Sequence, residues 1–308
     1  MLALPRDSDG VTLTLKELLS RSEHQRLVRS HHSGRACALQ AGERLSRLKG
    51  RGMEFSEVRP YQYGDDIRSI DWRVTARTGK AHTKLFQDER EQPVLLCVDM
   101  GNRLQFGSQL VLQSVQAAHL AALIGWHVSQ QGDRLGGVIA SEAQHRELKP
   151  KARRAGILPI LETLVELQQP TLSHSQPDQT GRYWHNALER LQRLARPGSQ
   201  IVIIANPLGF DEIALNQLRQ LRKHAQLRLF CITDPLFNTL AQQQTTLPIQ
   251  VGSAGPIRWL DPKNAALLAI RWKQAHHNAH EHGRQLQLPV TEISAAVPLE
   301  QQWQQLWL

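Results

Sequence analysis

The sequence predicts an α/β fold in which a Rossmann-type, doubly wound and mostly parallel sheet follows a charged N-terminal extension. Three observations favour this class. Continuous apolar runs such as "PVLLCVDMG" at 93–101 end in polar turns, as buried parallel strands do. Segments of helical length and periodicity separate these runs. The alternation starts near residue 92 and continues along the chain, which is typical of a sheet covered by helices.

The alternating part can be divided into elements in chain order. Pro262 is placed in the first turn of its helix, whereas Pro159 should kink or split the helix that contains it. The strands are predicted at residues 93–101, 133–140, 145–149, 200–209, 226–235, 246–252, 257–261 and 288–294. The helices are predicted at residues 108–131, 152–168, 182–195, 211–225, 262–286 and 298–307.

The domain prediction places an N-terminal extension at 1–92 and an α/β domain at 93–308. The extension contains an amphipathic helix at 15–30 and a dense charged signature at 34–92. We expect this helix and strand extension to brace the first strand of the sheet.

Composition leaves two interpretations of the charge open. The chain has 308 residues, a net charge of +9 and a pI near 9.9. The basic residues are spread along the chain without a run of five or six, so a solvated basic surface is favoured over an anionic partner such as nucleic acid. Three cysteines without close spacing indicate no disulfide framework. Because the start "MLALPRDSDG" lacks an apolar core, we expect a cytoplasmic protein without membrane insertion.

The segment "YGDDIRSIDWRVTAR" at 63–77 interleaves three acids and three arginines around Trp72. Such a cluster fits a partly buried ion-pair network, because arginine pairs with carboxylates in a bidentate fork. A partner-docking surface and a catalytic site are the alternatives. The candidate structural or docking cluster consists of Arg51, Glu54, Arg59, Asp65, Asp66, Arg68, Asp71, Trp72, Arg73 and Arg77.

Histidines are numerous, at 14, and several lie on the predicted helix 262–286. His276 and His280 are four residues apart, so they share a helix face and have the spacing to chelate a transition metal. Basic residues surround them, and an exposed polar face is the favoured interpretation. No Gly-x-Ser-x-Gly elbow supports a serine hydrolase.

The signature closely resembles that of the domain-of-unknown-function family 58, with a dense match over roughly residues 34–108. The matching motifs are Gly50-Arg51-Gly52, Glu54-Phe55, Arg59-Pro60-Tyr61, Gly64-Asp65-Asp66, Arg68, Ile70-Asp71-Trp72, Ala76-Arg77, Glu89, the strand to Asp99, and "LQFGS" at 104–108.

This resemblance implies a von Willebrand A-like domain that works beside a MoxR-type AAA+ ATPase. In such a domain, the end of the first strand carries an Asp-x-Ser-x-Ser motif that binds Mg²⁺ through hard oxygen ligands. Here Gly101 stands at the first serine position and Arg103 at the second. Glycine offers no side-chain ligand, and arginine adds a positive charge that repels the ion. We therefore expect no metal and no cofactor at this degenerate site, which consists of Asp99, Gly101, Arg103, Thr180 and Asn206.

The expected function is that of a non-enzymatic adaptor that links a MoxR-type ATPase to a client protein for assembly or maturation. Further von Willebrand A-type proteins are candidate partners. One alternative is a metal-dependent hydrolase that uses Asp65, Asp66, Asp71 and Asp99. Another is a basic nucleic-acid-binding protein, which the interleaved acids and the scarcity of exposed aromatic residues make less favoured.

Overall fold

The computed structural model describes residues 4, 7–31, 53–63, 65–88, 93–173, 181–242, 244–250, 257–288 and 290–302, without the side chains of 24–31, 53–57, 84–88 and 170–173. The chain divides into two compact units. The signature unit is Ala36–Glu91, and the sheet unit combines Met1–Arg35 with Gln92–Leu308.

The sheet unit confirms the predicted α/β class with a mostly parallel central sheet. Among the described residues, six strands lie in the order β10-β7-β6-β3-β4-β5, and only the edge strand β5 is antiparallel to its neighbour. The strands are β3 Val94–Asp99, β4 Arg134–Ala140, β5 His145–Ala152, β6 Gln200–Ala205, β7 Gln226–Thr233 and β10 Val290–Ser294. A separate antiparallel pair joins β8 Leu247–Gln250 to β9 Ile257–Leu260, as the sequence predicts.

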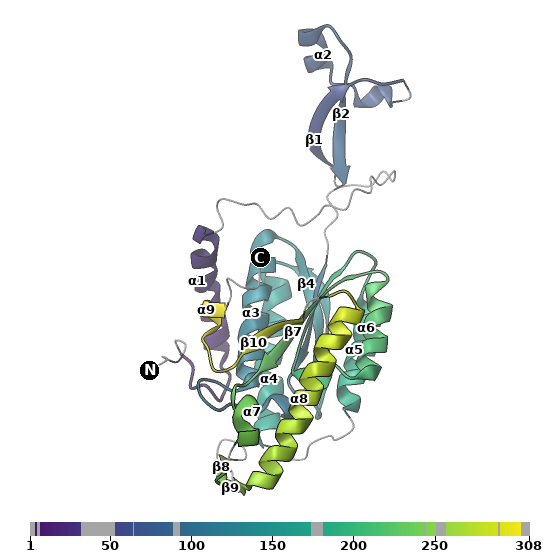
Figure 1. The fold of residues 1–308 in the computed structure, drawn as a ribbon. Coiled ribbons are helices and arrows are strands. Elements are labelled where there is room, and N and C mark those ends of the chain that lie inside the picture. The colour runs from purple at the N-terminus through teal and green to yellow at the C-terminus, as the bar shows by residue number, and fades with distance from the viewer. Residues whose placement is uncertain are drawn as a thin grey trace. The chain divides into compact units, whose positions relative to one another are not determined.

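Helices cover both faces of the sheet (Figure 1). Alternate residues of β3 point to opposite faces, so Leu96 and Val98 pack with α1, α3 and α4, whereas Leu95 and Cys97 pack with α5 and α6. The sheet-unit helices are α1 Leu15–His31, α3 Gln113–Gln131, α4 Arg154–Ser173, α5 Arg182–Leu194, α6 Glu212–Arg222, α7 Leu236–Thr239, α8 Pro262–Gln285 and α9 Leu299–Gln302.

Aspartate side chains cap the starts of α6 and α8. Asp211 accepts a hydrogen bond from the Ala214 amide at the start of α6, and Asp261 accepts one from the Asn264 amide at the start of α8. The predicted break at Pro159 is wrong as a split, because α4 runs without interruption through that residue. Pro159 lies in the second turn, where its missing amide removes a single helical hydrogen bond.

The N-terminal helix α1 belongs to the sheet unit, whereas the sequence pattern grouped it with the signature. Leu18 is buried in the core beside α3, and the Leu18 carbonyl accepts a hydrogen bond from Trp126 Nε1 at 3.1 Å. Glu17 and His119 are fully buried and lie 2.5 Å apart. This packing attaches α1 to the helical layer of the sheet.

The signature unit is built on an antiparallel pair, β1 Met53–Pro60 and β2 His82–Asp88, with a bulge between Phe55 and Glu57. The segment between the strands folds back onto β2 through two backbone contacts. Asp71 donates its amide to the His82 carbonyl at 2.8 Å, and Ile70 bridges Thr83. This segment contains η1 Ile67–Ser69 and α2 Trp72–Thr78. The predicted bracing of the first sheet strand stays a prediction.

None of the helices in the described ranges combines the length and the apolar character that crossing a bilayer requires.

Candidate functional site

Asp99 stands at the carboxyl end of β3, where ligand sites of parallel sheets lie. Its carboxylate is fully buried. The Gly101 amide donates to Oδ1 at 2.8 Å, and the Tyr183 hydroxyl donates to the same oxygen at 2.9 Å. Burial raises the pKa of Asp99 to about 6, and these two hydrogen bonds oppose part of that rise. Burial and the neighbouring Asp99 also raise the pKa of Tyr183 well above its usual value.

The surroundings of Asp99 are crowded by the protein's own groups. A Cβ atom on Gly101 would lie 2.6 Å from Tyr183 Cζ, so only glycine fits against that ring. The Asn102 amide donates to both Glu142 carboxylate oxygens at 2.9 Å. One oxygen, Asp99 Oδ2, is buried without a hydrogen-bond partner. Among the described residues, the groups that donate to Asp99 are a phenol and a backbone amide, and Asp99 belongs to no described group of three metal-ligating side chains.

The structure brings four of the five residues of the predicted degenerate site to one edge of the sheet. The Asn206 amide group donates to the Arg103 carbonyl at 2.9 Å, and its oxygen accepts from the Leu208 amide at 3.0 Å. Arg103 Nη1 donates to the Leu208 carbonyl at 3.3 Å. Asn206 and Arg103 therefore tie the loops after β6 and β3 together. Thr180 lies outside the described residues.

A second buried carboxylate closes the same edge at the end of β7. Asp234 accepts from the Ser108 amide at 2.9 Å and from the Ser108 hydroxyl at 2.6 Å. It also accepts from the Leu236 amide at 2.9 Å, which starts α7. This contact holds the "LQFGS" loop against the strand end.

Tyr183 and Glu142 are the contacts of this edge that sequence reasoning missed. Tyr183 lies in the first turn of α5, and Glu142 lies in the turn after β4. Tyr183 is 84 positions from Asp99 in the chain, and Glu142 is 40 positions from Asn102. No local sequence pattern marks a residue for a contact at such a separation. The indirect signal was Gly101, because a residue without a Cβ atom allows another group to pack closely against it.

The acids of the signature unit cap and close its turns. Asp65 accepts from Arg59 Nη2 at 2.7 Å and from the Gln62 amide at 2.9 Å. The Gln62 amide and Arg59 lower the pKa of Asp65. Asp66 caps η1 by accepting from the Arg68 amide at 3.0 Å.

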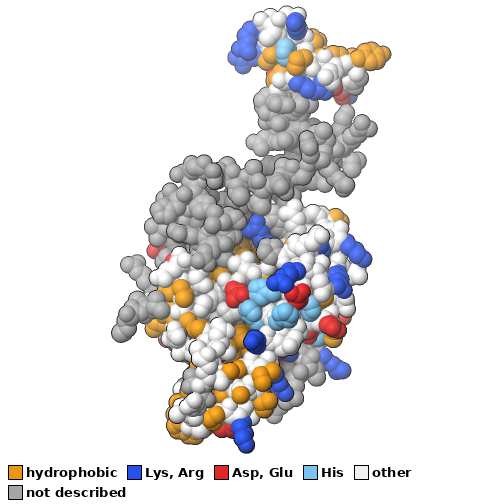
Figure 2. Space-filling view, in the orientation of Figure 1, with side chains coloured by type: hydrophobic (Ala, Val, Ile, Leu, Met, Phe, Trp, Pro, Cys, Tyr) orange, Lys and Arg blue, Asp and Glu red, His pale blue; other side chains and the backbone are white. Residues whose placement is uncertain are grey.

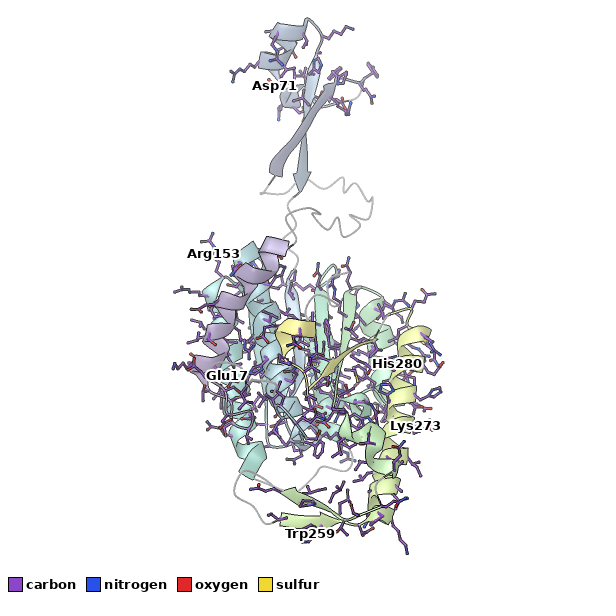
Figure 3. All side chains as sticks on the ribbon, turned by 60° about the vertical axis from the view of Figure 1, so that its left-hand side comes forward. Glu17, Asp71, Arg153, Trp259, Lys273 and His280 are labelled. Carbon is purple, nitrogen blue, oxygen red and sulfur yellow. The ribbon has the colours of Figure 1, made fainter. Side chains whose placement is uncertain are left out.

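Asp71 caps α2 (Figure 3) by accepting from the Arg73 amide at 3.0 Å and the Val74 amide at 3.2 Å. Each acid of the 63–77 segment therefore has a local backbone task. These bonds support an architectural part for the cluster without deciding between a network and a docking surface.

The long side chains of the same segment are directed to solvent. Trp72 is 67% exposed, and Arg68, Arg73 and Arg77 are exposed as well. Figure 2 shows basic and hydrophobic side chains together on the visible side of this unit. Arg51 and the side chain of Glu54 lie outside the description. We call Trp72, Arg68, Arg73 and Arg77 the signature surface.

The predicted catalytic use of four aspartates receives no support from this geometry. Within the described part of the chain, the group of three metal-ligating side chains close enough for one ion is His276, His280 and Glu292. None of Asp65, Asp66, Asp71 or Asp99 belongs to it.

One family model matches most of the chain. The family model described as "Protein of unknown function DUF58" matches residues 57–282. Uncharacterized proteins of Mycobacterium bovis and Mycobacterium tuberculosis are 33% identical over 181 residues, which is 59% of this chain and 54% of theirs. The chain thus spans about half the length of these curated relatives.

Two solved structures show a distant likeness. One is the conserved hypothetical protein BatB from Bacteroides thetaiotaomicron, with a TM-score of 0.42 and 13% identity over 70% of this chain and 96% of that chain. The other is an aerotolerance-related membrane protein from Bacteroides fragilis, with a TM-score of 0.43 and 12% identity over 70% of this chain and 97% of that chain.

Proposed function

The chain belongs to the DUF58 family of proteins of unknown function, and from this premise we propose that it is a non-enzymatic adaptor. It works with a MoxR-type AAA+ ATPase in the assembly or maturation of a client protein in the cytoplasm. Its sheet unit is a von Willebrand A-like domain in which the metal-binding edge has become structural. The resemblance of the signature to the family supplies the identity of the ATPase partner.

The observation that carries the adaptor proposal is the exposed signature surface. Tryptophan and arginine dominate the binding energy of protein interfaces, and an indole that is 67% exposed on a short helix leaves most of its apolar area in water. The acids of the same segment are engaged by backbone amides, so the face of Trp72 and Arg73 offers apolar area beside positive charge. This chemistry fits an acidic, partly apolar patch on a protein partner.

The strand-end edge supports an adaptor that captures its partners without a bridging ion. Integrin-like capture needs an ion with an open position for the partner's carboxylate. Asp99 here accepts from Tyr183 and Gly101, and Arg103 extends across the loop to Leu208. Partner contacts at this edge therefore depend on side chains instead of a shared metal.

A capture experiment tests the proposal. The tagged full chain is used to retain proteins from lysate of its own cells, with and without ATP, and the proteins are identified by mass spectrometry. We expect an AAA+ ATPase whose recovery changes with nucleotide and falls by at least about tenfold for Trp72→Ala, because a central tryptophan of an interface contributes 2 kcal/mol or more. The matched control is Trp259→Ala, a tryptophan of similar exposure (68%) on β9. Equal recovery by all three proteins would overturn the assignment of this surface.

The exposed aromatic residues also favour a second candidate, binding of single-stranded nucleic acid. Tyr63 and Trp72 are both exposed in the signature unit, which also carries exposed arginines. Bases stack on such rings while arginines contact phosphates. Affinity for a labelled oligonucleotide that falls steeply between low and moderate salt, and falls again in Trp72→Ala, would support this candidate over the adaptor.

A further inference from the structure

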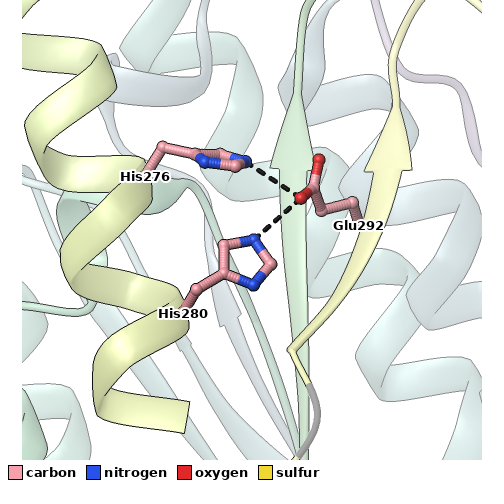
Figure 4. Close-up of side chains that lie close together, drawn as sticks. All are labelled: His276, His280 and Glu292. Atoms are coloured by element: carbon pink, nitrogen blue, oxygen red, sulfur yellow. Dashed lines mark hydrogen bonds and ion pairs between the residues drawn. The ribbon is translucent and has the colours of Figure 1, made fainter. Parts of the chain in front are cut away.

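Three side chains from two elements meet at the open edge of the sheet (Figure 4). His276 Nε2 lies 2.9 Å from Glu292 Oε1, and His280 Nε2 lies 2.8 Å from the same oxygen. The two rings are 4.6 Å apart between centroids. One ligand atom from each side chain can be chosen so that all lie within 4.8 Å of one another. Two imidazole nitrogens and a carboxylate oxygen thus point at one small region.

The fold holds this arrangement from both sides. His276 and His280 lie one turn apart on α8, so they share a face of the helix. Ala279 and Gly283 have the same spacing, and both are buried against the sheet. On β10, alternation places Glu292 on the same side as Val290, which packs in the core beneath α8. A Cβ atom on Gly283 would lie 2.6 Å from Val290 Cγ2, so the glycine allows α8 to approach β10 closely. This close approach brings both imidazoles to Glu292.

The donor set and its spacing match those of a transition metal. Zinc binds histidine nitrogen and carboxylate oxygen at about 2.0–2.2 Å, and a tetrahedral arrangement of such bonds separates the ligand atoms by about 3.3 Å. The two nitrogen–oxygen separations of 2.9 and 2.8 Å need to widen by only about half an ångström. The ligand nitrogens of the two rings lie within 4.8 Å of each other. All three side chains are partly exposed, at 34%, 31% and 42%, so an ion reaches them from solvent without opening the core.

We propose that His276, His280 and Glu292 form a binding site for a divalent transition metal of the Zn²⁺ class. The ion takes the place of the two hydrogen atoms that the Nε2 atoms share with Glu292, and each neutral ring then carries its proton on Nδ1. Three protein ligands leave a fourth tetrahedral position for water or a group from a partner. The bound ion joins α8 to the edge strand β10. The site is independent of the adaptor proposal, since it uses none of the residues of the signature surface.

Neighbouring histidines of α8 supply the internal comparison. His277 is exposed on the next position of the helix, outside the group of three, and His282 Nδ1 lies 2.8 Å from the Phe210 carbonyl. Figure 2 shows histidine side chains gathered on this face of the sheet unit beside both acidic and basic side chains. A general attraction of metal to a histidine-rich helix would therefore involve His277 as much as His280.

The test uses the purified full chain, treated with a chelator and then titrated with Zn²⁺ by calorimetry and with Co²⁺ by visible absorption, which intensifies in four-coordinate sites. The expected result is saturable one-to-one binding and a higher melting temperature with metal. His280→Ala and Glu292→Gln should each weaken binding by more than about tenfold, since even outer-shell partners of metal ligands contribute 10–100-fold. His277→Ala should bind like the unmodified chain.

Two results would overturn the site. One is the absence of saturable binding in the unmodified chain. The other is equal weakening by His277→Ala and His280→Ala, which would indicate adventitious binding along the helix. Melting curves recorded without metal confirm that each variant is folded, and folding is expected because all three substituted residues are at least partly exposed.

Discussion

Asp99 in the sheet unit and Asp71 in the signature unit perform similar local tasks in opposite environments. Both accept backbone amides two residues ahead, Asp99 from Gly101 and Asp71 from Arg73. Asp99 is fully buried under Tyr183, whereas Asp71 caps a short helix whose long side chains are directed to solvent. At the sheet edge the polar side chain therefore points into the protein. In the signature unit the acids bind backbone amides, while the side chains of Trp72 and the neighbouring arginines are exposed.

The largest expected contrast is between the stability effects of replacing Trp184 in the sheet unit and Trp72 in the signature unit. Trp184 is 1% exposed, packs in the core of the sheet unit and donates to the Gly209 carbonyl at 2.8 Å. Trp184→Ala should therefore reduce the free energy of unfolding by about 4 kcal/mol, through the lost burial and the cavity. Trp72→Ala should change it by less than about 0.5 kcal/mol. Denaturant unfolding measures both, and comparable losses would contradict the contrast.

A pH series on Asp99→Asn isolates the buried carboxylate. Because burial raises the pKa of Asp99 from 3.8 to about 6, the folded protein retains a proton that the unfolded chain releases in that window. Stability contributed by the protonated group is thus lost as pH rises through the window, by about 3 kcal/mol in total. The unfolding free energy of Asp99→Asn relative to the unmodified protein should increase from pH 4 to pH 7.

Asp65→Asn provides the control for that series with the opposite sign. The pKa of Asp65 is lowered, first by the Gln62 amide and then by Arg59, so its ionised form favours the folded state and its contribution is lost as pH falls. The relative stability of Asp65→Asn should decrease as pH rises. Parallel pH trends for the two variants would show that the carboxylates do not differ as described.

Alanine substitutions at Gly101 and Gly79 should destabilise the protein for different reasons, crowding at Gly101 and backbone strain at Gly79. Gly101 has an ordinary φ of −73° but lies against the Tyr183 ring, so Gly101→Ala should destabilise by about 2 kcal/mol through overlap. Gly79 ends α2 at φ 68° with nothing near its missing Cβ, so Gly79→Ala should cost about 1 kcal/mol through strain alone. Thermal melting of both variants, with Tyr183→Ala added to each, measures the difference. We expect Tyr183→Ala to recover part of the stability lost in Gly101→Ala and none of that lost in Gly79→Ala. The reverse pattern would refute the crowding argument.

The last expected effect is confined to α2. Asp71→Ala removes the acceptor of the Arg73 and Val74 amides, which should destabilise the helix by about 1 kcal/mol. Hydrogen exchange of amides in Trp72–Thr78 should accelerate roughly fivefold, as that free energy implies. Asp71→Ser retains a capping oxygen and should exchange nearly as slowly as the unmodified protein. Unchanged exchange in Asp71→Ala would mean that the cap contributes nothing.

Much of the sheet unit was predictable because its signals are local. The apolar runs that became β3, β6 and β7 needed only hydrophobic continuity and polar ends, and Asp211 marked the start of α6 by its capping chemistry. The uninterrupted helix through Pro159 was not predictable in this way. Packing of its apolar face in the core stabilises α4 despite one missing hydrogen bond.

By itself the sequence determined the order of the main strands and helices of the sheet unit, the family, and the spacing that puts His276 and His280 on one helix face. Those properties depend on residue periodicity and short motifs. It did not predict the strand pair β1 and β2 or the helix α2 of the signature unit. Only the tertiary structure decided that Tyr183 covers Asp99, that Trp72 stays in solvent, and that Glu292 joins the two histidines. The contacts of Tyr183 and Glu292 join segments far apart in the chain, and such contacts leave no periodic trace in either segment.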